Sequence, residues 1–211
     1  MLTDVFGWLP EPPRKVALLR PSRIGDFLCA TPAFRALRAA LPDAEITMIT
    51  LPMLAELVRR SPALDRFAAF PGYPGLAEQL FDARAAARFL ATMQAERFDL
   101  AIQMHGSGVH ANPFALMLGA RATAGFVRPG DAPGRLDAAL AFPAEGHETE
   151  RLLALCSHLG AFDPSQPSVA TRTEFPLRDE DHAAAAHLLS NASRPYIGFH
   201  PFARHARDLR R

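Results

Sequence analysis

The sequence predicts an α/β fold, a Rossmann-like parallel sheet with helices on both faces. Short apolar runs alternate along the chain with longer segments in which apolar residues recur at helical spacing. The first run, Val16–Leu19, is wholly apolar, as is typical of a strand buried on both faces. The 211 residues are 49% hydrophobic, which is enough for a substantial core. Right-handed crossovers in such a sheet place ligands beyond the carboxyl ends of the strands.

Five strands are expected in the first part of the chain, each a short run rich in apolar or β-branched residues. They are Val16–Leu19, Glu45–Thr50, Arg66–Phe70, Asp99–Met104 and Ala122–Phe126. The segments between them carry an apolar stripe or are rich in alanine, which favours helices that pack one face on the sheet. These helices are Phe27–Leu41, Met53–Arg60, Ala85–Ala95 and Ala111–Leu118.

The rest of the chain predicts two more helices and one more strand. The helices are Glu148–His158, which Gly160 can terminate, and Asp179–Leu189, which Asn191 can terminate. A linker-like segment separates them, and the chain then enters a buried strand at Tyr196–Phe199.

Composition excludes several classes of function. The chain has 23 basic and 22 acidic residues, so charge alone gives it no grip on nucleic acid, and a small-molecule or glycan substrate fits better. Cys29 and Cys156 lack metal-site spacing and are expected to be reduced thiols. With no signal peptide or apolar run long enough to span a membrane, we expect a cytoplasmic protein. Met1–Leu9 can form an apolar stripe that either packs on the domain or touches a membrane.

The run from Val16 to Leu37 resembles the opening of the family 9 glycosyltransferases, which include the lipopolysaccharide heptosyltransferases. Its first strand leads into Gly25-Asp26, and the following helix contains Thr31-Pro32 and Ala36-Leu37. Leu41–Ile46 and the segment from Asp99-Leu100 to Ser107 are also similar to that family. The likeness spans most of the chain.

This resemblance implies an inverting glycosyltransferase of the GT-B architecture, located in the cytoplasm or peripherally on the cytoplasmic face of the inner membrane. Its donor would be a nucleotide-sugar such as ADP-heptose, its acceptor a glycolipid of the lipopolysaccharide core, and neither metal nor another cofactor would be needed. Residues 1–175 would form the acceptor-side domain, 176–194 an interdomain helix and linker, and 195–211 the first strand of a truncated donor-binding domain. Such a chain is expected to be incomplete and inactive alone.

The C-terminal resemblance is less close. Tyr196–Pro201 is similar to the first strand of the family's donor-binding domain, where the sequence usually continues His-Pro-Gly-Ala-Ser. Here Phe202 replaces the glycine and Arg204 the serine. The resemblance assigns a contact with the donor phosphate to Arg210.

Asp26 is the candidate catalytic residue, because the family's general base aligns with it alone. A carboxylate beyond the end of a strand can remove the proton of an acceptor hydroxyl as the anomeric carbon becomes oxocarbenium-like. The alternative is a helix N-cap, a role for which Asp is equally suited. Gly25 is expected to supply a backbone conformation or close approach that a side chain would block. Arg23 is a candidate for binding the acceptor, whereas Arg20 is expected to be a solvated arginine.

A second candidate segment follows the fourth strand. Backbone amides of His105, Gly106 and Ser107, together with Asn112, are placed to line an acceptor site, and a plain turn is the alternative. Ser107 is not in a nucleophile elbow, which requires Gly-x-Ser-x-Gly. His105 and His110 lack a carboxylate at metal-ligand spacing, so we expect no metal site.

Two other functions remain open. A truncated chain can be a non-catalytic binding domain or remnant, and donor binding would distinguish this possibility from an enzyme. A nucleotide-dependent oxidoreductase also suits the sheet pattern. However, the first loop has only Gly25 in place of Gly-x-Gly-x-x-Gly, and Thr50 stands where an acidic residue would bind the ribose.

Overall fold

The structure is a computed structural model that describes residues 7, 9, 11–163, 165, 171–191 and 196–199. The chain divides into two compact units, residues 1–176 and 177–211. Arg210 and most of Met1–Leu9 lie outside the described residues.

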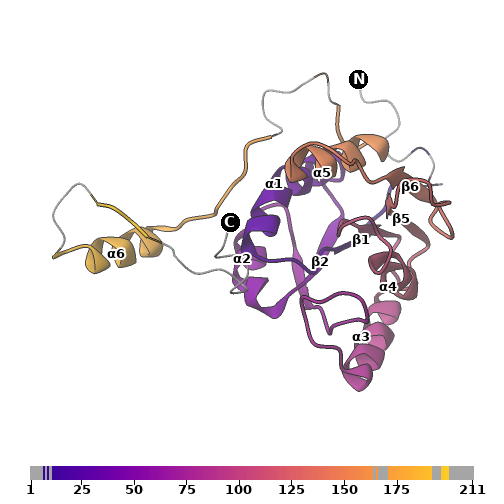
Figure 1. The fold of residues 1–211 in the computed structure, drawn as a ribbon, viewed down its shortest axis with the longest axis horizontal. Coiled ribbons are helices and arrows are strands. Elements are labelled where there is room, and N and C mark those ends of the chain that lie inside the picture. The colour runs from indigo at the N-terminus through magenta and orange to yellow at the C-terminus, as the bar shows by residue number, and fades with distance from the viewer. Residues whose placement is uncertain are drawn as a thin grey trace. The chain divides into compact units, whose positions relative to one another are not determined.

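The first unit is built on a six-stranded parallel sheet in the order β3-β2-β1-β4-β5-β6 (Figure 1). This is the order of a Rossmann fold, so the predicted fold class is confirmed. The strands are β1 (Lys15–Leu19), β2 (Glu45–Thr50), β3 (Arg66–Ala69), β4 (Leu100–Gln103), β5 (Ala122–Val127) and β6 (Ala138–Ala141). The first five match the sequence prediction, and β6 was not predicted.

Helices cover both faces of the sheet (Figure 1). Val16 and Leu18 of β1 face α1, α2 and α5, whereas Ala17 and Leu19 face α3 and α4. Each face has a buried core, so the apolar strands predicted from the sequence are buried on both sides as expected. The helices of this unit are α1 (Ile24–Ala40), α2 (Ala55–Arg60) after a 3₁₀ turn (Pro52–Leu54), α3 (Ala83–Glu96), α4 (Ala111–Met117) and α5 (Glu148–His158).

The Thr31-Pro32 pair lies inside α1, where proline removes a backbone donor. The carbonyl of Leu28, four residues earlier, therefore lacks its usual partner. The Thr31 hydroxyl donates to that carbonyl at 2.7 Å, and Thr31 Oγ1 also accepts from the Glu174 amide at 3.0 Å. Thr31 thus offsets the loss at Pro32 and ties α1 to the segment that leaves this unit.

The second unit contains α6 (Asp179–Leu188), which has no buried residue. This helix agrees with the prediction over 179–189. The predicted strand Tyr196–Phe199 is wrong: these residues form no strand, and Ile197 and Phe199 are 79% and 87% exposed. A strand needs a neighbour that pairs with its backbone groups, and the described residues of this unit provide none.

Candidate functional site

The candidate site lies at the point in the sheet where the strand order reverses, between β1 and β4. β1 and β4 are neighbours, and the crossovers that follow them run to opposite sides of the strand order. In an open parallel sheet this arrangement leaves a crevice outside the carboxyl ends of the two strands. The loop after β1 leads to Asp26, and the loop after β4 begins with Met104 and His105. The structure therefore brings the two predicted segments to one place.

Asp26 lies in the first turn of α1 and is exposed. The residue at the N-cap position is Arg23, so the alternative that Asp26 is itself the N-cap is wrong in position. Asp26 Oδ2 accepts from the Arg23 backbone amide, but the distance of 3.5 Å makes this a weak contact. The carboxylate is thus held near the helix N-terminus while its oxygens remain open to a ligand.

Gly25 departs from one part of its expectation, that of a backbone conformation only glycine adopts. It lies within the first turn of α1, its φ is outside the left-handed region, and a Cβ built there would have no atom within 4 Å. Neither backbone conformation nor packing within the protein requires glycine at this position. The adjacent Arg23 is also exposed. The start of α1 therefore presents an open surface beside Asp26.

Arg20 is buried, which contradicts the expectation of a solvated arginine: the residue is 1% exposed. Its guanidinium donates to the backbone carbonyl of Asp26 through Nε at 3.3 Å and Nη2 at 3.1 Å. It also donates to the carbonyl of Met104 and pairs with Glu148 Oε1 at 3.0 Å. Arg20 thereby joins the first turn of α1, the end of β4 and the start of α5. The only sequence signal of this buried role was the position of Arg20 directly after a buried strand.

His105 lies at the centre of a group of charged side chains. Its Nε2 is 3.9 Å from Oε2 of Glu78, a residue in the loop between β3 and α3. Burial holds the pKa of His105 below its ordinary value. Glu78 opposes this shift most strongly, Arg20 adds to it, and Asp26 and Glu148 oppose it further. Two residues of the predicted site, Asp26 and His105, are therefore close enough to interact electrostatically, and Glu78 was not anticipated.

A buried glutamine fixes the turn that carries His105. The side chain of Gln103 donates to the His105 carbonyl, and the Phe126 amide donates to Gln103 Oε1 at 3.0 Å. A polar side chain at the end of an otherwise apolar strand was a signal for this role. Gln103 thus couples the backbone at His105 to β5.

Ser107 and Asn112 belong to a separate hollow next to this turn. With Arg128 and Arg135 they line a cavity of about 250 Å³ between the loops that follow β4 and β5. Asn112 Nδ2 donates to the Phe126 carbonyl at 2.9 Å, and its buried Oδ1 has no hydrogen-bond partner within the described part of the chain. Gly108 has a φ of +81°, and a Cβ there would lie 2.2 Å from the Phe126 oxygen. Gly106 is exposed, and a Cβ built there would have no atom within 4 Å.

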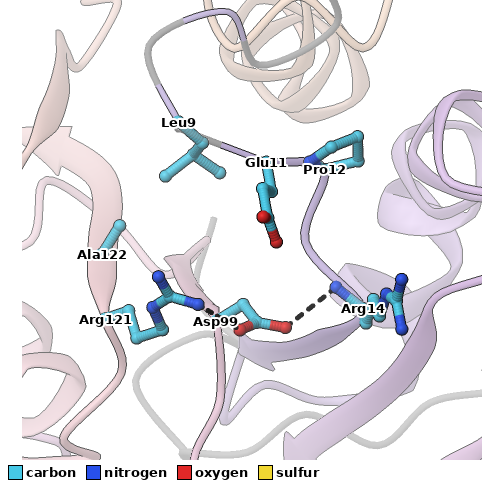
Figure 2. Close-up of a pocket in the computed structure, with 7 residues that line it drawn as sticks. All are labelled: Leu9, Glu11, Pro12, Arg14, Asp99, Arg121 and Ala122. Carbon is cyan, nitrogen blue, oxygen red and sulfur yellow. Dashed lines mark hydrogen bonds and ion pairs between the residues drawn. The ribbon is translucent and has the colours of Figure 1, made fainter.

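A larger pocket, of about 400 Å³, opens at the opposite edge of the sheet (Figure 2). It lies at the amino ends of β1, β4 and β5. Figure 2 shows Asp99 between Arg14 and Arg121. The Asp99 carboxylate accepts from the Arg14 amide at 2.9 Å and lies 3.5 Å from Arg121 Nη1. Its oxygens are thus engaged in joining the strand starts, and we assign this pocket no catalytic role.

The described residues contain neither a metal site nor a membrane-spanning helix. No group of three or more His, Cys, Asp or Glu side chains in this part of the chain is arranged to hold a metal ion. No helix there is long and apolar enough to cross a membrane.

Comparison with solved structures identifies the fold. A family 9 glycosyltransferase from Veillonella parvula is similar with a TM-score of 0.65 and 18% identity, over 84% of this chain and 49% of that one. The fold is that of about half a glycosyltransferase. Heptosyltransferase II of Escherichia coli is similar with a TM-score of 0.63 and 19% identity, over 90% of this chain and 55% of that one. The E. coli heptosyltransferase WaaC with ADP-2-deoxy-2-fluoro heptose is similar with a TM-score of 0.53 and 19% identity, over 85% of this chain and 55% of that one.

These likenesses confirm the predicted resemblance at the level of the fold. This chain spans about half the length of each of the three proteins. No protein-family model matches the chain, and no curated protein sequence does.

The lowered pKa of His105 predicts how stability depends on pH. The unfolded chain binds a proton at His105 near the ordinary pKa of 6.5, and the folded protein does so only at lower pH. The free energy of unfolding should therefore decrease as the pH falls through this window, because the unfolded state takes up the proton first. His105→Gln should reduce this dependence in denaturant titrations at pH 7.5 and below, and His158→Gln, at an exposed position, should not. Equal pH dependence in wild type and His105→Gln would refute this assignment.

Proposed function

We propose that this protein is a glycosyltransferase that transfers a heptose or similar sugar from a nucleotide-sugar to a lipopolysaccharide-core or related glycolipid. The observation that carries the proposal is the exposed carboxylate of Asp26 at the switch point between β1 and β4, in a fold shared with heptosyltransferases. Asp26 acts as the general base, and the reaction inverts the anomeric configuration.

The chemistry needs one proton acceptor and one leaving group. The acceptor oxygen attacks the anomeric carbon while Asp26 removes its proton, and the bond from that carbon to the nucleotide phosphate breaks on the opposite face. The nucleoside diphosphate leaves with the bonding electrons. A single displacement of this kind inverts the configuration. An exposed carboxylate is suited to this role because the hydroxyl group of a bulky sugar can reach it.

The surroundings of Asp26 fit a hydroxylated acceptor. Gly25 leaves space for a ring to approach the first turn of α1, and Arg23 lies beside it. Farther along the edge, Ser107 and Asn112 line the same hollow, and hydroxyl and amide side chains are groups that hydrogen-bond sugar hydroxyls. We assign these residues and His105 to acceptor binding.

The donor is proposed from the structural neighbours, one of which is described with ADP and with an ADP-heptose analogue. The diphosphate would be met by helix N-termini and cationic side chains such as Arg210, without a metal. The oxidoreductase alternative is disfavoured by Thr50, whose hydroxyl donates to the Arg20 carbonyl at 2.7 Å at the position where a dinucleotide fold places an acid.

The test is a transfer assay with ADP-heptose and a lipopolysaccharide-core glycolipid that lacks heptose, with the product identified by mass spectrometry. Gly25→Ala is the informative variant, because the helical backbone and open space at Gly25 accept a methyl group. The variant should unfold at the same or a slightly higher denaturant concentration, since alanine favours a helix over glycine by up to about 1 kcal/mol. Its transfer rate should nevertheless fall, because the methyl group occupies space proposed for the acceptor.

Absence of transfer with a panel of nucleotide-sugars, by a form of the protein that is competent to bind the donor, would refute the proposed function. If the folded protein binds no nucleotide-sugar, the non-catalytic domain or remnant becomes the better description. Unchanged transfer by Gly25→Ala would instead remove this glycine from the acceptor site.

A further inference from the structure

A short segment is strapped across α1 where the chain leaves the first unit. This segment, the strap, is residues 172–176, which form neither helix nor strand. Two side chains of α1 hold it, and they are four residues apart and hence on one face of the helix. The Glu174 amide donates to Thr31 Oγ1 at 3.0 Å, and Arg35 Nη2 donates to the Arg172 carbonyl at 2.6 Å. Arg35 Nη1 also pairs with Glu174 Oε1 at 3.0 Å. These contacts are the latch.

The Thr31-Pro32 pair gives α1 its acceptor for the strap. Pro32 has no amide to donate to the Leu28 carbonyl, and the Thr31 hydroxyl donates to that carbonyl at 2.7 Å instead. Because the hydroxyl proton is committed there, the lone pairs of Thr31 Oγ1 are left to accept from the Glu174 amide. A motif that the proposed sugar chemistry does not use therefore has a role at the exit of the chain.

Alternate residues of the strap face α1. The Arg172 carbonyl and the Glu174 amide and carboxylate contact the helix, and Pro176 lines a cavity of about 20 Å³ together with the buried Phe27. Phe175, between two of these residues, is 50% exposed. A period of two is that of an extended chain lying along a surface. The strap thus has one edge on the helix and one edge in solvent.

The latch, rather than apolar burial, holds the strap. Residues 171–175 are exposed, and only Pro176 is partly buried. Segments with few buried apolar contacts and solvent-exposed hydrogen bonds open at a lower free-energy cost than a buried sheet does. The compact first unit ends at Pro176, so the strap is the last segment of this unit. Opening of the latch would therefore leave the sheet and its covering helices intact.

We propose that the strap is a releasable tether. In the latched state the connection to the second unit begins after Pro176, and in the released state residues 172–176 join it. No covalent bond changes, because the contacts of the latch are exchanged for contacts with water. Five more residues of free chain extend the reach of the connection by at most about 17 Å. This inference goes beyond the proposed function and does not depend on it, since the latch uses none of the residues assigned to sugar transfer.

The experiment is limited digestion of the folded 211-residue chain by trypsin, with the fragments identified by mass spectrometry. Trypsin cuts after arginine, and the carbonyl of the Arg172–Thr173 bond is the one that accepts from Arg35. This bond should therefore be cut only in the released state. Arg35→Gln should speed the cut about tenfold, because cleavage follows the population of the open form and the variant loses both the ion pair and the hydrogen bond.

Urea distinguishes release of the strap from unfolding of the whole unit. Release exposes few residues, so the rate of the Arg172–Thr173 cut should hardly rise with urea below the unfolding midpoint. The activity of trypsin at each urea concentration is measured with a free peptide substrate. High salt should speed the cut in wild type more than in Arg35→Gln, because it screens the Arg35–Glu174 pair.

Matched variants separate the latch from other surface contacts. Thr31→Val keeps the shape of the side chain but cannot accept from the Glu174 amide, so the cut should become severalfold faster. Thr31→Ser keeps the hydroxyl and should behave like wild type. Arg59→Gln removes an arginine that is 63% exposed and pairs with Glu56 on α2, and it should leave the rate unchanged.

Two results would overturn the proposal. Equal rates of the Arg172–Thr173 cut in wild type and Arg35→Gln would show that the latch does not hold the strap. A rate that rises with urea as steeply as global unfolding would show that the strap opens only with the whole unit and is not a tether. The digestion involves no sugar, so its outcome is separate from that of the transfer assay.

Discussion

Replacement of Asp26 by alanine or asparagine should lower the rate of sugar transfer by about 10²- to 10⁴-fold, the usual contribution of a general base. Asparagine keeps the size of the side chain but cannot accept the proton of the acceptor hydroxyl. Transfer is measured in a form of the protein that is competent for it, with ADP-heptose as the donor. Donor binding should change little, because the proposed role of Asp26 concerns the acceptor.

The competing role of Asp26 is structural, and its expected effect is small. The carboxylate accepts one long hydrogen bond, from the Arg23 amide at 3.5 Å, and lies near the positive end of α1. A favourable charge in the first turn of a helix contributes about 0.3–1 kcal/mol to stability. Loss of this contribution would lower the unfolding midpoint slightly and leave transfer intact.

A matched control is Asp43→Asn, which removes another exposed carboxylate, in the turn before β2. It should leave the transfer rate unchanged. Transfer by Asp26→Ala within about threefold of wild type, which is less than about 1 kcal/mol of activation free energy, would show that Asp26 is not the base.

The fold was predictable because most strands have a recognisable local pattern. Val16–Leu19 is buried on both faces and is wholly apolar, so its pattern alone indicates its position in the sheet. β6 gave no such signal. Its sequence, Ala138–Ala141, has little β propensity, and it forms a strand because β5 offers its backbone groups in register, with Ala124 opposite Ala138.

Tyr196–Phe199 shows the converse. Its sequence is a strand-like apolar run, yet the described part of the second unit has no strand to pair with it. Strand formation at β6 and its absence at 196–199 therefore depend on neighbours, which a local pattern does not contain.

The site was predictable only where it coincides with a motif. Asp26 and His105 follow strands that are adjacent in a Rossmann order, so their meeting at the switch point follows from topology. Glu78 approaches His105 from a loop far along the chain, and Glu148 reaches Arg20 across 128 positions. Such pairs are set by tertiary packing, and nothing in the flanking residues encodes them. The roles assigned to Asp26, His105 and Asn112 stay predictions.

Arg20→Met should destabilise the protein by about 3–5 kcal/mol, the cost of breaking a buried ion pair by removing one partner. Methionine retains much of the apolar stem of Arg20 but leaves the carbonyls of Asp26 and Met104 without their side-chain donor. The unsatisfied carbonyls, at about 1–3 kcal/mol each, are part of this cost. Glu148→Gln should also be destabilising, because it leaves the Arg20 guanidinium, which is 2% exposed, without its carboxylate partner.

The measurement is the free energy of unfolding from denaturant titrations of the 211-residue chain. Arg121→Met is the control, because the Arg121 side chain is 66% exposed, and a surface change of this kind falls within about 0.5 kcal/mol of wild type. Arg20→Met and Glu148→Gln should be strongly non-additive in a double-mutant cycle, since both remove the same contact. A loss below about 1 kcal/mol in Arg20→Met would show that the buried guanidinium does not hold α1, β4 and α5 together. The backbone that carries Asp26 would then be fixed by the packing of α1 alone.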